Sequence, residues 1–248
     1  MDVKRVALIT GGMGGLGEAI SVRLLADGFR VVVTYSPHND HVSTWLESQW
    51  GQRRTIAAFP IDVDDFTNCQ ECVARVQEEI GNIDVLVNNA GITRDGTFRK
   101  MSFEDWRAVL TTDLDSMFNV TRPICDGMAE RGWGRIVNIS SVVGSRGAIG
   151  QANYAAAKSG IHGFTKSLAL ELARHGVTVN TVSPGFMDTK MVRAIPEEVL
   201  TQRIIPLIPA GRLGRPSEVA GLVSYLCSEE GAYVTGANFA VNGGYHMS

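Results

Sequence analysis

The sequence Thr10-Gly-Gly-Met-Gly-Gly-Leu-Gly17 stands between a short apolar run and a helical pattern. Two glycine spacings overlap in it, G-x-G-x-x-G and T-G-x-x-x-G-x-G. Glycines at a strand-to-helix turn let the backbone approach a pyrophosphate, and the following helix presents its positive N-terminus to that group. A P-loop is excluded, because Glu18-Ala19 stands where Lys-Ser/Thr is needed. The turn therefore predicts a dinucleotide site that comprises Gly11, Gly12, Met13, Gly14, Gly15, Leu16 and Gly17.

Apolar runs and helical patterns alternate along the rest of the chain. Strands are predicted at Val3–Ile9, Arg30–Tyr35, Thr55–Ile61, Ile83–Val87, Arg135–Ile139, Val177–Val182 and Asn238–Val241. Helices are predicted at Gly17–Asp27, Val42–Trp50, Phe66–Ile80, Ser102–Glu130 (with Ser102 as cap), Ala152–Arg174 and Ser217–Cys227. We expect a Gly-rich linker between Gly144 and Asn153, and a loop with short helical pieces from Pro184 to about Pro209. Repeated β-α-β units predict a single α/β domain over residues 1–248, a Rossmann fold whose doubly wound parallel sheet has about seven strands and helices on both faces.

Composition and charge limit the classes of protein to consider. The chain has 248 residues, of which 44% are hydrophobic, and one α/β domain of this size buries a full core. The net charge is −3 and no basic run occurs, so neither a nucleic acid nor an anionic membrane is expected as a partner. The N-terminal apolar run is too short for a signal peptide, and no run approaches the length that spans a membrane. We expect a cytoplasmic protein.

The cysteines and histidines give no sign of redox or metal chemistry. Cys69-Gln-Glu-Cys72 has the spacing of a redox pair, but no thioredoxin-like context surrounds it. The apolar side chains of this segment repeat at helical spacing, which favours core packing for Cys69; they are Phe66, Cys69, Val73, Val76 and Ile80. The five His residues show no ligand spacing, so we predict no metal.

A second stretch carries candidate catalytic groups. Ser141 follows the predicted strand Arg135–Ile139, at the end of the sheet where α/β proteins place their ligands. Tyr154 and Lys158 are four residues apart on a predicted helix, so they share one face with roughly 5–6 Å between their Cβ atoms. A positive charge beside a phenol favours its ionised form, which suits Tyr154 to proton transfer near neutral pH. A hydroxyl, a phenol and an ammonium are therefore expected to meet at one point.

The end of the second strand bears on which dinucleotide binds. NAD sites usually place an acid about 20 residues after the glycine motif, where it binds the ribose hydroxyls. Here the strand ends at Tyr35 and Ser36, and the first acid is Asp40. Small hydroxyl side chains leave room for a 2′-phosphate, which favours NADP(H). His38 and His41 lie either near that phosphate or in a solvated loop, and the loop contains no Arg or Lys.

The ordered set of motifs resembles the short-chain dehydrogenase/reductase family over the whole chain. Its members are the glycine turn, Asn88-Asn89-Ala90-Gly91, Ser141, Tyr154-x-x-x-Lys158 and Pro184-Gly185. The resemblance implies a Rossmann fold, a nicotinamide cofactor and a homotetramer. It also implies that Tyr154 is the general acid, that Ser141 binds the substrate carbonyl, and that Lys158 binds the nicotinamide ribose and makes Tyr154 more acidic. The further cofactor contacts expected are Tyr35, Ser36, Asp62, Val63, Asn88, Asn89, Ala90, Gly91, Pro184, Gly185 and Thr189.

Three runs resemble the bacterial acetoacetyl-CoA reductases within that family, namely Gly91–Met101, Asp126–Gly134 and Asn242–Ser248. Those enzymes make (R)-3-hydroxybutyryl-CoA for polyhydroxyalkanoate synthesis. The alternative is a 3-oxoacyl-[acyl-carrier-protein] reductase of fatty acid synthesis, which shares Ile92–Asp95 and Gln151–Tyr154. The substrate residues implied are Asp95, Ser141, Ala148, Ile149, Gln151, Tyr154 and Phe186. At Ala148, Ile149 and Phe186 this chain departs from the Gln, Phe and Tyr of the acetoacetyl-CoA reductases.

Asp113 is the departure nearest the chemistry, because most family members carry Asn at this position. There the backbone carbonyl is expected to hold a water linked to the lysine. If only the backbone matters, which we favour from the sequence, Asp113→Asn leaves the pH profile in place. If the side chain matters, a carboxylate near Lys158 partly cancels the pull of that lysine on Tyr154.

Other classes of protein fit less well. No G-x-S-x-G elbow indicates a hydrolase. A nucleotide sensor without turnover would lack one of Ser141, Tyr154 and Lys158, and all three are present.

The predicted Tyr154 helix is apolar nearly all round, as is the long helix before it, so both need cover beyond the sheet. The residues concerned are Ala155, Ala156, Ala157, Gly160, Ile161, Gly163, Phe164 and Leu168, and Trp106, Leu110, Leu114, Met117 and Phe118. We expect the two helices to pair across a two-fold axis in a homotetramer.

Overall fold

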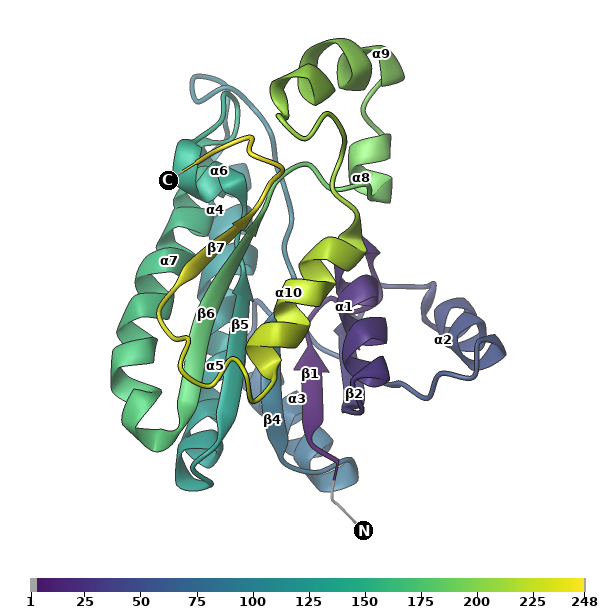
Figure 1. Ribbon diagram of the computed structural model, residues 1–248, viewed down its shortest axis with the longest axis vertical. Helices are drawn as coiled ribbons and strands as arrows, with labels where there is room; N and C mark the ends of the chain where they lie inside the picture. Colours follow the sequence, from purple (N-terminus) through teal and green to yellow (C-terminus); the bar gives the residue numbers. More distant parts are fainter. Residues whose placement is uncertain (1–3, 248) are drawn as a thin grey trace.

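The computed structural model describes residues 4–247, and its strands form a seven-stranded parallel sheet of order β3-β2-β1-β4-β5-β6-β7 (Figure 1). The strands are β1 Val6–Ile9, β2 Arg30–Tyr35, β3 Ala57–Pro60, β4 Ile83–Asn88, β5 Gly134–Ile139, β6 Val177–Pro184 and β7 Asn238–Val241. The chain runs outward from β1 to β3 and then returns to β4 on the other side of β1. This reversal is the switch point beside which open α/β sheets bind their ligands. The predicted fold class is confirmed.

Helices cover both faces of the sheet, as the β-α-β pattern predicts. Helices α1 (Gly15–Ala26) and α10 (Pro216–Cys227) lie on one face, and α3 (Phe66–Glu79), α5 (Ser116–Glu130) and α7 (Ala152–Leu172) lie on the other (Figure 1). The remaining helices are α2 Val42–Gly51, α4 Phe103–Leu110, α6 Val142–Arg146, α8 Lys190–Arg193 and α9 Glu197–Val199. Short π and 3-10 turns occupy Thr111–Asp115, Ala173–His175, Leu200–Ile204 and Ile205–Leu207.

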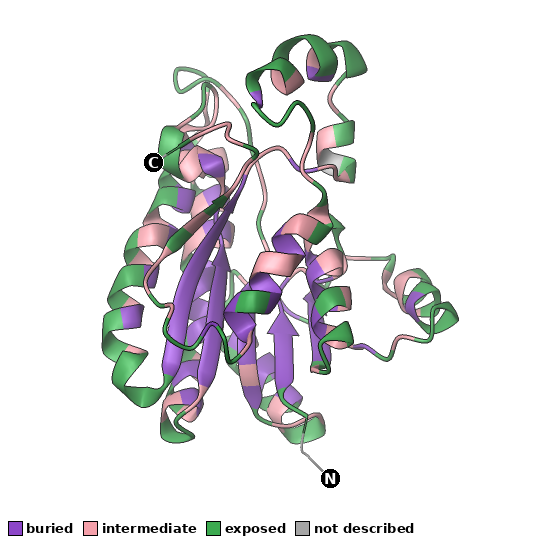
Figure 2. Cartoon of the chain, in the orientation of Figure 1, coloured by how far each residue is buried: buried purple, intermediate pink, exposed green. Residues whose placement is uncertain are grey.

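The central strands are buried on both sides, as the colouring of Figure 2 shows. In β1, Val6 and Leu8 point into the cluster under α3 and α5, whereas Ala7 and Ile9 point into the cluster under α1 and α10. Because successive side chains of a strand alternate between faces, a strand covered on both faces needs apolar residues at every position. This is why the strands read as continuous apolar runs.

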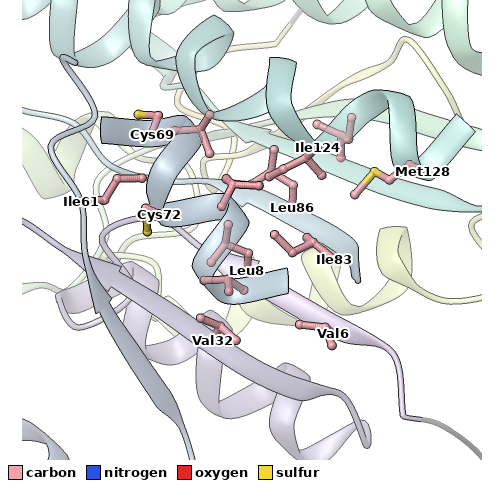
Figure 3. Close-up of a cluster of buried hydrophobic side chains, with 14 of the residues drawn as sticks. Val6, Leu8, Val32, Ile61, Cys69, Cys72, Ile83, Leu86, Ile124 and Met128 are labelled. Carbon is pink, nitrogen blue, oxygen red and sulfur yellow. The ribbon is translucent and has the colours of Figure 1, made fainter. Parts of the chain in front are cut away.

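Cys69 and Cys72 belong to the first of these clusters (Figure 3). Both are free thiols, and burial raises the pKa of Cys69 to about 12 and that of Cys72 to about 11. A redox pair needs an accessible thiolate, so the predicted core role of Cys69 is confirmed. Phe66, in the same predicted apolar stripe, is 36% exposed and stacks on Phe118 of α5 instead.

The long helix predicted over Ser102–Glu130 is interrupted. Ser102 does cap it, since its Oγ accepts a hydrogen bond from the Asp105 N–H at 3.0 Å. However, α4 ends at Leu110, and a π-helical turn over Thr111–Asp115 leads into α5. This turn consists largely of Thr and Asp, which are weak helix formers, and π turns change the direction in which side chains point.

Two other predictions need correction. The first strand begins at Val6, and Val3 lies outside the described residues. The stretch after Ser141 was predicted without a helix, but its first part is the short helix α6. Its five residues are too few to show a helical period, and Gly144 within it and Gly147 after it favour a loop in the sequence. In the part of the chain that the structure describes, no helix has the length and apolarity needed to cross a membrane.

Candidate active site

The predicted site residues come together at the carboxyl ends of the parallel strands. The glycine turn follows β1, Asn89–Gly91 follows β4, Ser141 follows β5, and Gly185 follows β6. Carboxyl ends of parallel strands share one edge of the sheet. Helix α7 reaches the same edge, because Lys158 Nζ donates a hydrogen bond to the carbonyl of Ile139, the last residue of β5.

Close contacts leave no room for a side chain at Gly12 and Gly17 of the glycine turn. A Cβ on Gly17 would lie 2.4 Å from the carbonyl oxygen of Gly11, and one on Gly12 would lie 2.5 Å from the side chain of Val33. The hydroxyl of Thr10 accepts hydrogen bonds from the N–H groups of Asn89 and Ala90 at 2.9 and 3.0 Å. The turn after β1 and the loop after β4 are thus joined into one rigid surface.

Beside the turn lies a hollow of about 200 Å³. It is lined by Gly11, Thr34, Tyr35, Ser36, Ile61, Asp62, Val63, Asp64, Ile92 and Thr112. The hydroxyl of Thr34 is buried there without a hydrogen-bond partner among the described residues. A glycine surface that excludes side chains, next to a hollow at the ends of β2 and β3, fits a dinucleotide.

The other predicted cofactor residues have different positions. Thr189 lies against the glycine turn, since a Cβ on Gly15 would be 3.3 Å from its methyl group. Gly185 donates its N–H to the Val241 carbonyl at 2.9 Å. His38 and His41 are exposed and do not line the hollow. The lining of the hollow therefore contains no basic side chain.

Asn88 was expected to line the ribose side of the cofactor, and that expectation is wrong. Its side chain is buried and donates hydrogen bonds to Asn138 Oδ1 at 2.9 Å and Thr121 Oγ1 at 3.1 Å. Asn138 in turn donates to Thr165, whose hydroxyl lies 2.7 Å from that of Thr181. These bonds tie β4, β5 and β6 to α5 and α7 beneath the site. Asn89 binds the carbonyls of Thr10 and Gly11 and thus stabilises the glycine turn.

Tyr154 and Lys158 share one face of α7, as their spacing predicts. The ammonium lies 5.4 Å from the centroid of the Tyr154 ring. Tyr154 is half-buried, whereas Lys158 is only 3% exposed. Burial opposes the charge on Lys158, but Tyr154 and Asp113 outweigh it, and the pKa of Lys158 is raised. The ammonium is therefore held charged beside the phenol.

The Asp113 side chain also contacts this ammonium. Its Oδ2 lies 3.1 Å from Lys158 Nζ, and its Oδ1 accepts the N–H of Ile92 at 2.8 Å. The sequence favoured a role for the backbone carbonyl of Asp113 alone. The structure instead puts the carboxylate in direct contact with Lys158, because the π turn points the side chain inward.

Ser141 caps α6, the helix that the sequence did not predict. Its Oγ accepts the N–H of Val143 at 3.2 Å, which leaves the hydroxyl hydrogen free to donate elsewhere. A Cβ on Gly144 would lie 2.8 Å from the backbone of Lys158, so α6 and α7 pack closely. This close packing keeps Ser141 at the same edge as Tyr154 and Lys158.

The predicted substrate residues occupy two loops and the segment after β6. Gln151 donates to both oxygens of Asp95 at 3.0 and 3.1 Å, which joins the loop after β4 to the loop before α7. Ala148 and Ile149 are exposed in the second loop. Phe186 contacts the ring of Tyr245 edge to face at 5.3 Å.

Two groups of residues near the site are not indicated by any sequence pattern. Arg146 of α6 donates a hydrogen bond to the hydroxyl of Tyr245, and this aromatic residue covers Phe186. His162 Nε2 lies 3.0 Å from Ser140 Oγ, which donates to the carbonyl of Lys158. Tyr245 stands in a terminal run that carried the family resemblance, but nothing in its spacing pointed to Phe186.

Comparison with known proteins gives matches over almost the whole chain. A family model described as short chain dehydrogenase matches residues 5–200. The acetoacetyl-CoA reductase of Cupriavidus necator is 52% identical over 244 residues, which cover 98% of this chain and 99% of that protein. The acetoacetyl-CoA reductase of Shinella zoogloeoides is 50% identical over 242 residues, 98% of each chain. A 3-oxoacyl-[acyl-carrier-protein] reductase of Vibrio cholerae is 42% identical over 243 residues, again 98% of each chain.

The glycine turn gives a first prediction. Gly17→Ala forces a methyl group to within 2.4 Å of the Gly11 carbonyl, so the turn must shift. Overpacking of this kind costs about 1–3 kcal/mol, and about 1.4 kcal/mol is tenfold in affinity. We expect at least about tenfold weaker binding of the reduced nicotinamide dinucleotide by fluorescence titration and a lower Tm. Gly14→Ala is the matched control for the Tm, since a Cβ there meets no atom within 4 Å and should leave it unchanged. Unchanged affinity and Tm in Gly17→Ala would contradict the prediction.

Proposed function

The chain belongs to the short-chain dehydrogenase family, and we propose that it reduces acetoacetyl-CoA to (R)-3-hydroxybutyryl-CoA with NADPH. The product is the precursor of polyhydroxyalkanoate, and the proposal includes a cytoplasmic location. The relatives named as acetoacetyl-CoA reductases support the substrate, because they match almost the full length at 50 and 52% identity. The relative that is named for a carrier-protein substrate matches at 42% identity and gives the alternative.

The main support for this reaction is the position of the Lys158 ammonium. It lies 5.4 Å from the centroid of the Tyr154 ring, at the end of β5 that Ser141 follows. The nicotinamide cofactor, when bound, supplies the hydride. Ser141 donates its free hydroxyl hydrogen to the substrate carbonyl and holds it in place. Tyr154 donates its phenolic proton to the oxygen as the carbonyl is reduced, and Lys158 stabilises the phenolate that remains.

The proposed acid gives the second prediction. Tyr154→Phe removes only the hydroxyl, so NADPH binding should stay within about twofold while kcat falls by at least about 10³-fold. The assay follows NADPH absorbance with acetoacetyl-CoA as substrate. Near-normal kcat in Tyr154→Phe would remove Tyr154 from the mechanism.

The same assay of the unmodified enzyme, with acetoacetyl-CoA and separately with acetoacetyl-carrier protein, tests the substrate. A higher kcat/KM for acetoacetyl-CoA supports the proposal, and the opposite order favours the alternative.

The proposed cofactor preference gives the third prediction. Ser36 is exposed at the end of β2 beside the hollow, and neither Tyr35 nor Ser36 carries a carboxylate that would exclude a 2′-phosphate; the acids of the lining, Asp62 and Asp64, come from the segment after β3. We expect a higher kcat/KM with NADPH than with NADH. Ser36→Asp should lower the NADPH to NADH ratio by at least about tenfold, because like charges repel across a short distance. Ser43→Asp, an exposed serine in α2, is the matched control. Equal use of both cofactors by the unmodified enzyme would refute the preference.

We further propose a homotetramer in which α5 and α7 contact a second copy. Phe118 of α5 is 54% exposed and Leu170 of α7 is 84% exposed, which is unfavourable for large apolar side chains in water. Several residues offered from the sequence do not need a partner chain. Met117, Ala157 and Ile161 are buried within this chain, and Leu114 packs against Gly160 of α7.

Light scattering at micromolar concentration tests this fourth prediction. The unmodified protein should have the mass of four chains. Phe118→Glu should reduce that mass, since burying an unpaired carboxylate in the contact is costly. Trp50→Glu, which changes an aromatic residue that is 75% exposed on α2, should leave it unchanged. A monomer for the unmodified protein would exclude the tetramer.

A further inference from the structure

The ion pair of Asp113 and Lys158 is unusual in being buried on both sides. The two side chains are 0% and 4% exposed, and their charged atoms lie 3.1 Å apart. Every other ion pair among residues 4–247 has at least one side chain in contact with water. Buried ions are tolerated only when they find partners, so each of these two groups depends on the other.

The surroundings of Asp113 fit a carboxylate. Its Oδ1 accepts the Ile92 N–H, and its Oδ2 faces the Lys158 ammonium, so both oxygens face donors. A protonated acid would need an acceptor for its own hydrogen. Burial raises the pKa of the Asp113 carboxyl, and Lys158 and the Ile92 N–H oppose that rise.

The pair is enclosed by the loop after β4. A Cβ on Gly91 would lie 2.9 Å from Asp113 Oδ2 and 3.3 Å from Lys158 Nζ. Only glycine lets this backbone approach so closely. The contact between carboxylate and ammonium is therefore fixed by the π turn, α7 and the loop together.

A carboxylate at position 113 changes the electrostatic environment of the Tyr154 phenol. The ammonium alone favours the phenolate, and a negative charge 3.1 Å from that ammonium offsets part of its effect. Three other titratable groups face this region. Tyr154 lies beside Lys158 on α7, and Asp64, in the segment after β3, accepts a hydrogen bond from Thr112, the neighbour of Asp113. His162 lies one turn beyond Lys158 and contacts Ser140.

We propose that Asp113 is a positioning residue whose carboxylate fixes the Lys158 ammonium and offsets part of its charge. Tyr154 consequently keeps its proton to a higher pH than it would with a neutral side chain at position 113. In a reductase this extends the range in which the phenol acts as an acid toward alkaline pH. The kinetic part of this inference rests on the proposed function, whereas the charge coupling itself does not.

Asp113→Asn tests the proposal, because the amide oxygen still accepts the Ile92 N–H while the charge is lost. The first readout is the ultraviolet difference titration of Tyr154 in the cofactor-free protein. Each variant is compared with the same variant carrying Tyr154→Phe, so that the other tyrosines cancel. The second readout is the alkaline limb of kcat/KM for acetoacetyl-CoA reduction. We expect both midpoints to move to lower pH by about one unit.

Asp115→Asn is the matched control. It removes the same charge from the same π turn, but its side chain is 50% exposed and lies 3.5 Å from Arg107. Screening by water should keep its shift below about a quarter of a unit. If Asp113→Asn does not fold, Asp113→Ser carries both readouts.

The outcomes separate the two proposals. A shifted Tyr154 titration without acetoacetyl-CoA turnover keeps this inference and removes the proposed function. An unshifted Tyr154 titration in Asp113→Asn, or an equal shift in Asp115→Asn, overturns the inference whatever the substrate proves to be.

Discussion

The buried ammonium of Lys158 is the constraint on which the rest of the site depends. A charge removed from water requires oxygen partners at short range. The chain supplies them from the carbonyl of Ile139 at the end of β5 and from Asp113 in the π turn, while the Tyr154 ring lies on the same face of α7. Segments far apart in the sequence must therefore converge on one nitrogen atom. Gly91 and Gly144 allow that convergence, since a Cβ at either would press on the lysine or its partner.

The buried side chains beneath Lys158 Nζ are also polar, and they are hydrogen-bonded to one another. The hydrogen bonds from Asn88 through Asn138 and Thr165 to Thr181 join three strands, β4, β5 and β6, to α7. Polar groups inside a sheet are costly unless each finds a partner, and a satisfied network is stiff. The same helix that carries Tyr154 and Lys158 is thus anchored to the sheet by Thr165. The candidate acid and its cation are held on a rigid support.

Much of this protein was predictable from local patterns. The strand Arg30–Tyr35 and the strand Asn238–Val241 were predicted with their observed bounds. Burial on both faces gives Arg30–Tyr35 a clear apolar signature, whereas Asn238–Val241 lies at the edge of the sheet and is only partly buried. The glycine turn and the pair Tyr154 and Lys158 were equally clear, since their meaning depends on spacing along one element. The short helix α6 was not predicted, because five residues are too few to show a helical period.

The sequence by itself determined the layered α/β fold, the glycine surface at the end of β1 and the face of α7 that presents a phenol and an ammonium. Each of these depends on residues within one element or one turn, where spacing fixes geometry. Only the tertiary structure decided that Asn88 faces the interior and that the Asp113 carboxylate contacts Lys158. Both outcomes depend on which side chains from distant segments meet. For Asp113 they depend also on one π turn, whose extra residue rotates the side chain toward the lysine and leaves no mark in the helical period.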